Sequence, residues 1–420
     1  MECELNEQGR LKFKIEQSRF FDNHYRYVYD LKGHLLAVYK NDRLVEEYEY
    51  NELGQRAQQY SAENPPAVYL KYNAKGQLIR MDDTLFEYDK YGALNRKIYD
   101  PPHCIGSGET LYFYNGDTKL DKVILPSDDE ITYKYGRGED MQAQSPLQKF
   151  KNGKLVREYE WFDPFRLAAC LDHEKQLEFH FSYGERICPK SVRLKEYLPR
   201  PNQAEFLCGC DQVGTLKVLS SSPNELLTHI DYDSFGNVLS DAAPRLQLPI
   251  GFAGGLVDHD TGLVRFGYRD YNPTCGRFTC PDPMGDTGGD HDLYDYCVDD
   301  PVSMVDTNGL ESQSALRWLR ELGGLPRIDP QDVKYAGGGA AYGGLFGAGH
   351  LADIFSKPGV DVSEEFTRDV NSVWPKVWDV INISLGNKPG PWGQKVLEDI
   401  SNGVGKTIDK SKNQFMKNFE

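Results

Sequence analysis

A short unit built on Tyr-Asp or Tyr-Asn recurs through this chain and constrains its fold more than any other feature. Each copy has aromatic residues alternating with charged ones, then the Tyr-Asp or Tyr-Asn pair, two or three residues, and Gly. The copies are Tyr29-Asp30 to Gly33, Tyr50-Asn51 to Gly54, Tyr72-Asn73 to Gly76, Tyr88-Asp89 to Gly92 and Tyr232-Asp233 to Gly236. The first three copies are 21 and 22 residues apart, a period typical of stacked or wound repeat architectures.

The local chemistry of each copy predicts a β-hairpin. Alternation of aromatic and charged residues, as in residues 25–29, predicts a strand with one buried face. Asp or Asn then favours a turn by accepting backbone hydrogen bonds, and Gly adopts the positive φ that completes it. A single hairpin cannot bury its apolar face, so the units need their neighbours.

Charge and cysteine content exclude some classes of protein. The net charge of -16 leaves no basic excess to neutralise phosphates, so nucleic-acid binding is not indicated. The first residues lack the apolar core of a secretory signal, and we expect synthesis in the cytoplasm with reduced cysteines. Among the 9 cysteines the tight pair is Cys208-Gly-Cys210, and no second pair lies at zinc spacing.

Residues 262–310 close the repetitive part of the chain with a dense series of motifs. In order they are Arg269-Asp-Tyr-Asn-Pro273, Gly276-Arg-Phe278, Pro281-Asp282-Pro283-Met-Gly285, Gly288-Gly289, Leu293-Tyr294-Asp-Tyr296, Asp300-Pro301 and Asp306-Thr-Asn-Gly309-Leu310. This order resembles the core-associated ending of the Rhs family, and the Tyr-Asp units at residues 20–100 and 225–260 resemble its YD repeats. Between residues 100 and 225 the repeats are degenerate.

The resemblance implies a mainly β fold in which YD-repeat hairpins wind into a shell. It divides the chain into a YD-repeat region at 1–261, a core-associated region at 262–310, and a variable C-terminal toxin domain at 311–420. The last region changes composition and contains four of the 5 tryptophans. Because Leu316, Leu319 and Leu322 are spaced for one face of a helix, we expect this region to be small and mostly helical or α+β.

In Rhs proteins and the related C components of Tc toxins, this ending implies an internal aspartic protease that cleaves after the final Leu. Carried onto this sequence, the catalytic pair is Asp282 and Asp306, the supporting charge is Arg269, and the cleaved bond joins Leu310 to Glu311. Two nearby carboxylates cannot both ionise, so one serves as general acid while the other activates water. Arg269 would either hold a carboxylate by a bidentate contact or stabilise the oxyanion.

Asp282 and Asp306 have an alternative interpretation. Asp before Pro or before X-X-Gly is commonly only a turn acceptor, so both aspartates are also consistent with a purely structural role. Thr307 also stands where the family has Pro, which leaves the turn freer and predicts slow cleavage or none. A calcium loop formed by nearby acidic residues lacks the EF-hand spacing, and we expect no metal or cofactor. Those residues are Asp286, Asp290, Asp292 and Asp295.

The activity of residues 311–420 is not readable from their motifs. Small residues at 336–355 permit close helix contacts, so a membrane-inserting segment competes with a linker or an enzyme loop. Residues 403–407 resemble half of a phosphate loop, but Ile400 stands where its first Gly belongs. His350 with Asp353 forms no nuclease pattern.

The sequence therefore predicts a fragment of an Rhs-type polymorphic toxin that releases an effector for antagonism between bacteria or against a host. The implied partners are a cognate immunity protein and an N-terminal shell or delivery component, of the type VI secretion or Tc kind, with export by a specialised secretion system. The alternatives are a non-catalytic YD-repeat interaction or structural protein and a silent displaced toxin cassette.

Overall fold

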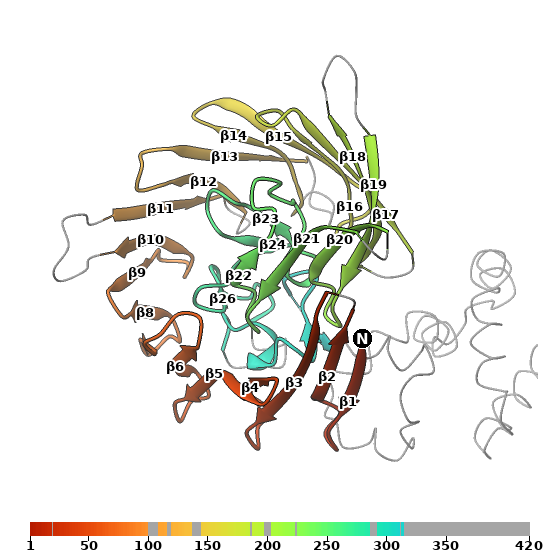
Figure 1. Cartoon of the computed structure of the whole chain (residues 1–420). Coiled ribbons are helices and arrows are strands. Elements are labelled where there is room, and N and C mark those ends of the chain that lie inside the picture. Colours follow the sequence, from red (N-terminus) through yellow and green to blue (C-terminus); the bar gives the residue numbers. More distant parts are fainter. Residues whose placement is uncertain are drawn as a thin grey trace, which may run out of the picture. The chain divides into compact units, whose positions relative to one another are not determined.

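The fold is given by a computed structural model of the whole chain (Figure 1). The residues it describes are 1–18, 20–99, 108–115, 119–136, 144–184, 187–196, 203–222, 225–285, 292–310 and 312–314. The C-terminal domain expected at 311–420, including the candidate membrane segment at 336–355, lies outside these residues apart from 312–314. Within the described part, no helix has the length and apolar character needed to cross a membrane.

A single antiparallel meander dominates the described residues, which confirms the mainly β prediction. Its 22 strands form one sheet in which each strand pairs with its neighbours in sequence. The first ten are β1 (Glu2–Leu5), β2 (Leu11–Gln17), β3 (Asp22–Tyr29), β4 (Leu35–Lys40), β5 (Arg43–Tyr50), β6 (Arg56–Ser61), β7 (Val68–Tyr72), β8 (Leu78–Met81), β9 (Thr84–Tyr88) and β10 (Leu94–Tyr99). The others are β11 (Gly108–Tyr114), β12 (Leu120–Ile124), β13 (Glu130–Tyr135), β14 (Pro146–Lys151), β15 (Lys154–Trp161), β16 (Leu167–Asp172), β17 (Leu177–Tyr183), β18 (Pro189–Glu196), β19 (Gln203–Cys210), β20 (Leu216–Ser222), β21 (Glu225–Tyr232) and β22 (Val238–Asp241).

Smaller elements follow the meander. A second sheet contains β23 (Leu256–Val257), β24 (Val264–Phe266), β25 (Arg269–Asn272) and β26 (Arg277–Phe278). The 3-10 turns η2 (Phe252–Gly254) and η4 (Cys297–Asp299) flank it, and β27 (Met304–Val305) pairs with β28 (Gln313–Ser314). In Figure 1 the strands of the meander follow one another around a curve, and β23, β24 and β26 lie on its concave side.

The repeat turns form as their sequence predicts. The Asn51 side chain accepts hydrogen bonds from the backbone N–H groups of Leu53 and Gln55, both at 3.0 Å. Asp89 makes the same two contacts to Tyr91 and Ala93, both at 2.9 Å. The short polar side chain thus satisfies donors that the hairpin leaves unpaired, which is why Asp or Asn recurs there.

A second function of the repeat tyrosine is visible only in three dimensions. The Tyr50 hydroxyl, at the end of β5, donates to the carbonyl of Leu35, the first residue of β4, at 2.8 Å. The same link from the end of one strand to the start of the preceding strand is made by Tyr29 to Leu11, Tyr72 to Arg56, Tyr135 to Leu120, Tyr183 to Leu167 and Tyr232 to Leu216. Each link ties one pair of adjacent strands together at the end away from the turn that joins them.

The region that looks degenerate in sequence keeps this plan with other side chains. Trp161 ends β15 and donates its indole N–H to the carbonyl of Pro146, the first residue of β14, at 2.9 Å. At the end of β19, Cys210 forms a disulfide with Cys188, which directly precedes β18, with the two Cα atoms 6.3 Å apart. The expectation of reduced cysteines is therefore wrong at this pair, because the fold brings two distant cysteines together, whereas Cys208 stays free.

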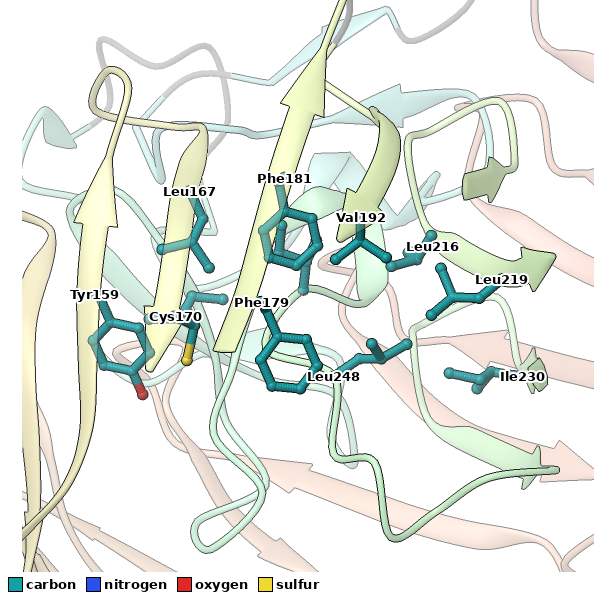
Figure 2. Close-up of a cluster of buried hydrophobic side chains, with 12 residues drawn as sticks. Tyr159, Leu167, Cys170, Phe179, Phe181, Val192, Leu216, Leu219, Ile230 and Leu248 are labelled. Atoms are coloured by element: carbon teal, nitrogen blue, oxygen red, sulfur yellow. The ribbon is translucent and has the colours of Figure 1, made fainter. Parts of the chain in front are cut away.

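Three buried clusters line successive parts of the meander, and each receives residues from the segment after β22. Figure 2 shows one of them, in which side chains from β15 to β21 lie in a row and Leu248 packs with them. Leu263 and Cys275 join the cluster of β7 to β13, and Val302 joins that of β2 to β5, together with Phe235 from the turn between β21 and β22. The later segments are thus the core on which the sheet packs.

The last strands of the meander contact the first through side chains. Lys217 on β20 lies 2.7 Å from Glu16 on β2, which is also 2.9 Å from Lys14. Burial would raise the pKa of Glu16, but the two ammonium groups lower it to about 2. Among the described strands, those at the two ends pair only with their sequence neighbours, so this contact, which we call the seam, closes the turn of the sheet without a ladder.

Candidate functional site

Three different elements bring the predicted catalytic residues together. Arg269 begins β25, Asp282 follows β26, and Asp306 directly follows β27. The β27–β28 pairing, in which Met304 is opposite Ser314, returns the chain beside itself just after Leu310. Residues as far as 37 positions apart in the chain therefore meet at one place.

Arg269 contacts both carboxylates with one nitrogen. Its Nη2 atom is 2.8 Å from Asp282 Oδ2 and 3.3 Å from Asp306 Oδ2. Because both distances end on the same atom, the two carboxylates lie within reach of each other's charge, and the guanidinium stands between them. The guanidinium also lies 3.7 Å from the ring centre of Phe278, and its side chain is 4% exposed. The arrangement is a shared contact and not the bidentate grip on one carboxylate considered from sequence.

The turn after Asp306 is fixed by the other oxygen of that carboxylate. Asp306 Oδ1 accepts hydrogen bonds from the N–H groups of Gly309 at 2.8 Å and Leu310 at 3.2 Å. Asn308 Oδ1 accepts from Leu310 N at 2.9 Å, and Arg269 Nε donates to the Gly309 carbonyl at 2.5 Å. The Asp306 side chain therefore acts both as a turn acceptor and as a partner of Arg269, and the turn is held with Thr307 in place of Pro.

A small cavity of about 40 Å³ lies between these groups. Both predicted aspartates line it, together with Leu310 and Ser312, which stand on either side of residue 311. A cavity of this size holds a water molecule when polar groups surround it. The carboxylates and the chain on both sides of the predicted cleavage bond therefore face one space.

The environment of Asp282 favours its protonated form. Burial raises the pKa of this carboxyl above its usual range, although Arg269 and a hydrogen bond from Met284 N at 2.8 Å act in the opposite direction. A carboxyl with a raised pKa next to a second carboxylate is the arrangement from which a general acid is built.

The structure thus brings together Asp282, Asp306, Arg269 and Leu310, whereas Glu311 lies outside the described residues. Sequence reasoning missed Leu293, whose carbonyl accepts hydrogen bonds from Asp282 N at 2.8 Å and from Arg269 Nη1 at 3.2 Å. It also missed Asn308 as a side-chain acceptor. The Asn-Gly pair signalled a turn, but no sequence signal marks a contributing backbone carbonyl.

The repeat meander and its inner core match a known family. The model of the Teneurin YD-shell matches residues 1–301. This chain belongs to the YD-shell family. Its relatives include teneurin-3 of Danio rerio, 26% identical over 291 residues, which are 67% of this chain and 10% of that protein. A bacterial relative is the tRNA3(Ser)-specific nuclease WapA of Bacillus spizizenii, 25% identical over 292 residues, which are 67% of this chain and 12% of the nuclease.

Solved structures also match this chain. A structure of the TcdB2-TccC3 complex matches with a TM-score of 0.42 and 15% identity, over 74% of this chain and 18% of the other. The chain covers about a tenth of the length of the first curated relatives.

Proposed function

We propose that this YD-shell chain cleaves itself after Leu310 by an aspartic mechanism and releases residues 311–420 as a toxin effector. The observation that carries the proposal is the shared cavity, because Asp282 and Asp306 line it together with Leu310 and Ser312. The core-associated motifs and the relationship to a nuclease toxin support it. The substrate is one bond of the same chain, so each molecule reacts once.

The first step requires one protonated and one ionised carboxyl in the pair. Their shared contact with Arg269 and the burial of Asp282 favour this state. The ionised carboxyl takes a proton from a water in the cavity, and the water oxygen attacks the Leu310 carbonyl carbon. The other carboxyl gives its proton to the developing tetrahedral oxygen.

In the second step the tetrahedral species collapses. The C–N bond to residue 311 breaks and the departing nitrogen takes a proton from the protonated carboxyl. One hydroxyl of the tetrahedral species gives its proton to the ionised carboxyl, and Leu310 becomes a carboxyl terminus. Arg269 limits the repulsion between the carboxylates and holds the Gly309 carbonyl at 2.5 Å. That carbonyl is one residue before the cleaved bond, so Arg269 serves to position the turn more than to bind the oxyanion.

Intact-mass spectrometry of the purified chain beside an Asp306→Asn variant tests this proposal. Asparagine keeps an oxygen that can accept from Gly309 and Leu310 N–H groups, so the turn persists while the acid-base function is lost. We expect a native fragment beginning at Glu311 in the wild type and an uncut chain in the variant. An uncut wild-type chain would overturn the proposal.

A second candidate, a scaffold with an idle pair, is favoured by one observation. Arg269 contacts both carboxylates at once, which is also how a structural ion-pair cluster is stabilised. Under this alternative the wild type stays uncut and Asp306→Asn only lowers stability. The same mass measurement together with thermal unfolding distinguishes the two candidates.

Release of an effector further implies a cognate immunity protein and a delivery component of the type VI secretion or Tc kind, with export from the cytoplasm of the producing cell. Co-expression supplies the test. Residues 311–420 produced alone should arrest growth of a bacterial host or of a eukaryotic cell, and a small downstream gene product should restore growth of the producing cell. Growth without arrest in both hosts would contradict the effector role.

A further inference from the structure

We propose that the meander sheet, which we call the wall of the shell, positions Asp282. Self-cleavage therefore begins only after the repeat hairpins around β7 to β10 have formed. This inference rests on the proposed self-cleavage and names what regulates it. The positioning residues are Tyr294 and Arg277, which connect the site to two repeat turns.

The segment 292–294 is the direct support of the site. The Leu293 carbonyl accepts hydrogen bonds from Asp282 N at 2.8 Å and from Arg269 Nη1 at 3.2 Å. One backbone carbonyl therefore sets the position of the acid and of the arginine relative to each other. Any displacement of residue 293 moves two members of the site at once.

The repeat turn between β9 and β10 holds this segment. The Tyr294 hydroxyl donates to the Gly92 carbonyl at 2.8 Å and accepts from Gln77 Nε2 at 3.1 Å. Its ring packs edge-on against Tyr88, the repeat tyrosine of that turn, at 5.7 Å. Because Gly92 and Gln77 belong to different hairpins, Tyr294 is fixed only when both have folded.

The same turn holds the other side of Asp282. Leu94 N, at the start of β10, donates to the Thr279 carbonyl at 2.8 Å, three residues before the catalytic aspartate. Asp282 thus lies between two points of attachment, Thr279 and Leu293, that the β9–β10 turn supports directly or through Tyr294. Without the turn, neither point has this support.

A buried ion pair makes a second connection, to the turn between β7 and β8. Arg277 Nη2 donates to the Gly76 carbonyl at 2.9 Å and to Asp292 Oδ1 at 2.6 Å. The same carboxylate oxygen accepts from Tyr294 N at 3.1 Å. The Arg277 side chain is 4% exposed, so the contact is well shielded from water and holds residues 292–294 against the wall.

Cleavage therefore depends on hairpins that lie far from the site in the sequence. Arg269, Gly309 and Asp306 contact one another within the core-associated region, whereas Asp282 depends on hairpins made more than 180 residues earlier in the chain. A chain whose wall is incomplete has its acid out of position, and its effector stays attached. Cleavage then occurs only in chains whose wall has folded. This order protects the producing cell from early release of the effector.

Cleavage half-times after pulse-labelled synthesis of the full chain test this inference. Tyr294→Phe removes the hydroxyl, and we expect cleavage to slow about tenfold, since small misplacements of catalytic groups have large effects on rate. Tyr183→Phe is the matched control, because it removes a similar bond, to Leu167 O at 3.0 Å, far along the meander. We expect it to lower the unfolding temperature comparably and to leave the half-time unchanged.

A second pair of variants acts from the wall side. A Cβ on Gly92 would lie 2.7 Å from the Tyr294 hydroxyl, whereas one on Gly54, with a similar φ, would meet nothing nearer than 3.4 Å. We expect Gly92→Ala to slow cleavage and Gly54→Ala to keep the wild-type rate. If Gly92→Ala fails to fold, Tyr294→Phe decides.

The outcomes separate this inference from the function on which it rests. An uncut wild type overturns both. A wild type that is cut, with Tyr294→Phe as fast as Tyr183→Phe, overturns the wall dependence alone. Slow cleavage only in the two variants at the β9–β10 contact supports it.

Discussion

At the scale of single residues, Gly309 shows how closely the chain before the proposed cleavage bond is packed. Its φ is +70°, and a Cβ there would lie 2.4 Å from the Phe266 carbonyl oxygen and 2.9 Å from Arg269 N. Gly267 lies against Asn308 from the other side, with a Cβ position 2.5 Å from the Asn308 carbonyl oxygen. The segment 308–310 is therefore held by two glycines that leave no room for a side chain.

Substitution of Gly309 by Ala should displace this segment from the site. We expect self-cleavage to fall by about a hundredfold, because a shift of an ångström at reacting groups has effects of this size. Gly153→Ala is the control, since Gly153 has a φ of +74° and open space around it. Cleavage time courses by gel should show loss only for Gly309→Ala. A cleavage rate for Gly309→Ala equal to that of Gly153→Ala would show that the close contacts of Gly309 do not control cleavage.

Glu46 is a second residue whose surroundings set a measurable property. It is buried on β5, accepts from the Tyr48 hydroxyl at 2.7 Å and from Ser234 N at 3.2 Å, and lies near Asp233. Burial, together with the charge of Asp233, raises its pKa to about 7. The folded state therefore prefers the protonated carboxyl at pH values where the unfolded chain is ionised.

The stability of the wild type should fall as the pH rises from 4.5 to 7, because the unfolded chain releases the Glu46 proton first, and level off above. Relative to Glu46→Gln, the loss should be on the order of 3 kcal/mol. Urea unfolding at several pH values measures it. Glu49→Gln, at an exposed position of β5, should retain the wild-type pH dependence. A parallel profile for Glu46→Gln would exclude this carboxyl as the cause.

At the scale of elements, the paired strands of the meander are joined by a side-chain link whose residue type varies from pair to pair. Tyrosine, tryptophan and a disulfide all join the end of one strand to the start of the preceding one, at Tyr50, Trp161 and Cys210. A hydrogen bond of this kind contributes about 1 kcal/mol. The backbone plan of the repeat therefore survives changes that hide it from a search for Tyr-Asp pairs.

The disulfide should contribute more than the hydrogen bond it replaces. Its loop spans 22 residues, and closing such a loop stabilises a fold by about 3 kcal/mol. We expect reducing agent to lower the unfolding temperature of the wild type and to leave a Cys188→Ala, Cys210→Ala double variant unchanged. Cys208→Ala, at a free cysteine of the same strand, should respond to reducing agent as the wild type does.

At the scale of the whole described fold, the seam joins the last strands of the sheet to the first. Glu16 is its centre, with Lys14 at 2.9 Å and Lys217 at 2.7 Å, and all three side chains are nearly buried. Buried charges need their partners, since removal of one leaves another without compensation. The closure of the sheet is therefore sensitive to single charge changes in a way that a backbone ladder is not.

Replacement of Lys217 by Met should open the seam. We expect a loss of roughly 3 kcal/mol, because Glu16 keeps only one of its two cations. Lys12→Met is the control, on the strand that contains Glu16. Because Lys12 and Glu4 form an exposed pair, the stability of this variant should equal that of the wild type. Urea unfolding gives the size, and hydrogen exchange should rise in β2 and β20. Similar stabilities for the two variants would show that the seam is not a stabilising contact.

The strands and turns of this fold could be predicted from short stretches of sequence. Alternating Tyr and charged residues specify strands, and Asp or Asn before Gly specifies turns, because both depend on contacts within a few residues. The resemblance of residues 262–310 to the Rhs family pointed to Asp282, Asp306 and Arg269 as the candidate site. The division at residues 261 and 310, and everything about 315–420, stays a prediction.

Only the tertiary structure decided how those parts are used. Cys188 pairs with Cys210 across two strands, Lys217 meets Glu16 after 200 residues, and Leu293 supports the site through its carbonyl. A backbone carbonyl has no sequence signature, and contacts between distant strands depend on how the sheet curves. The sequence by itself determined the hairpins and indicated the candidate side chains of the site, and the packing of the sheet around its inner core decided which of them meet.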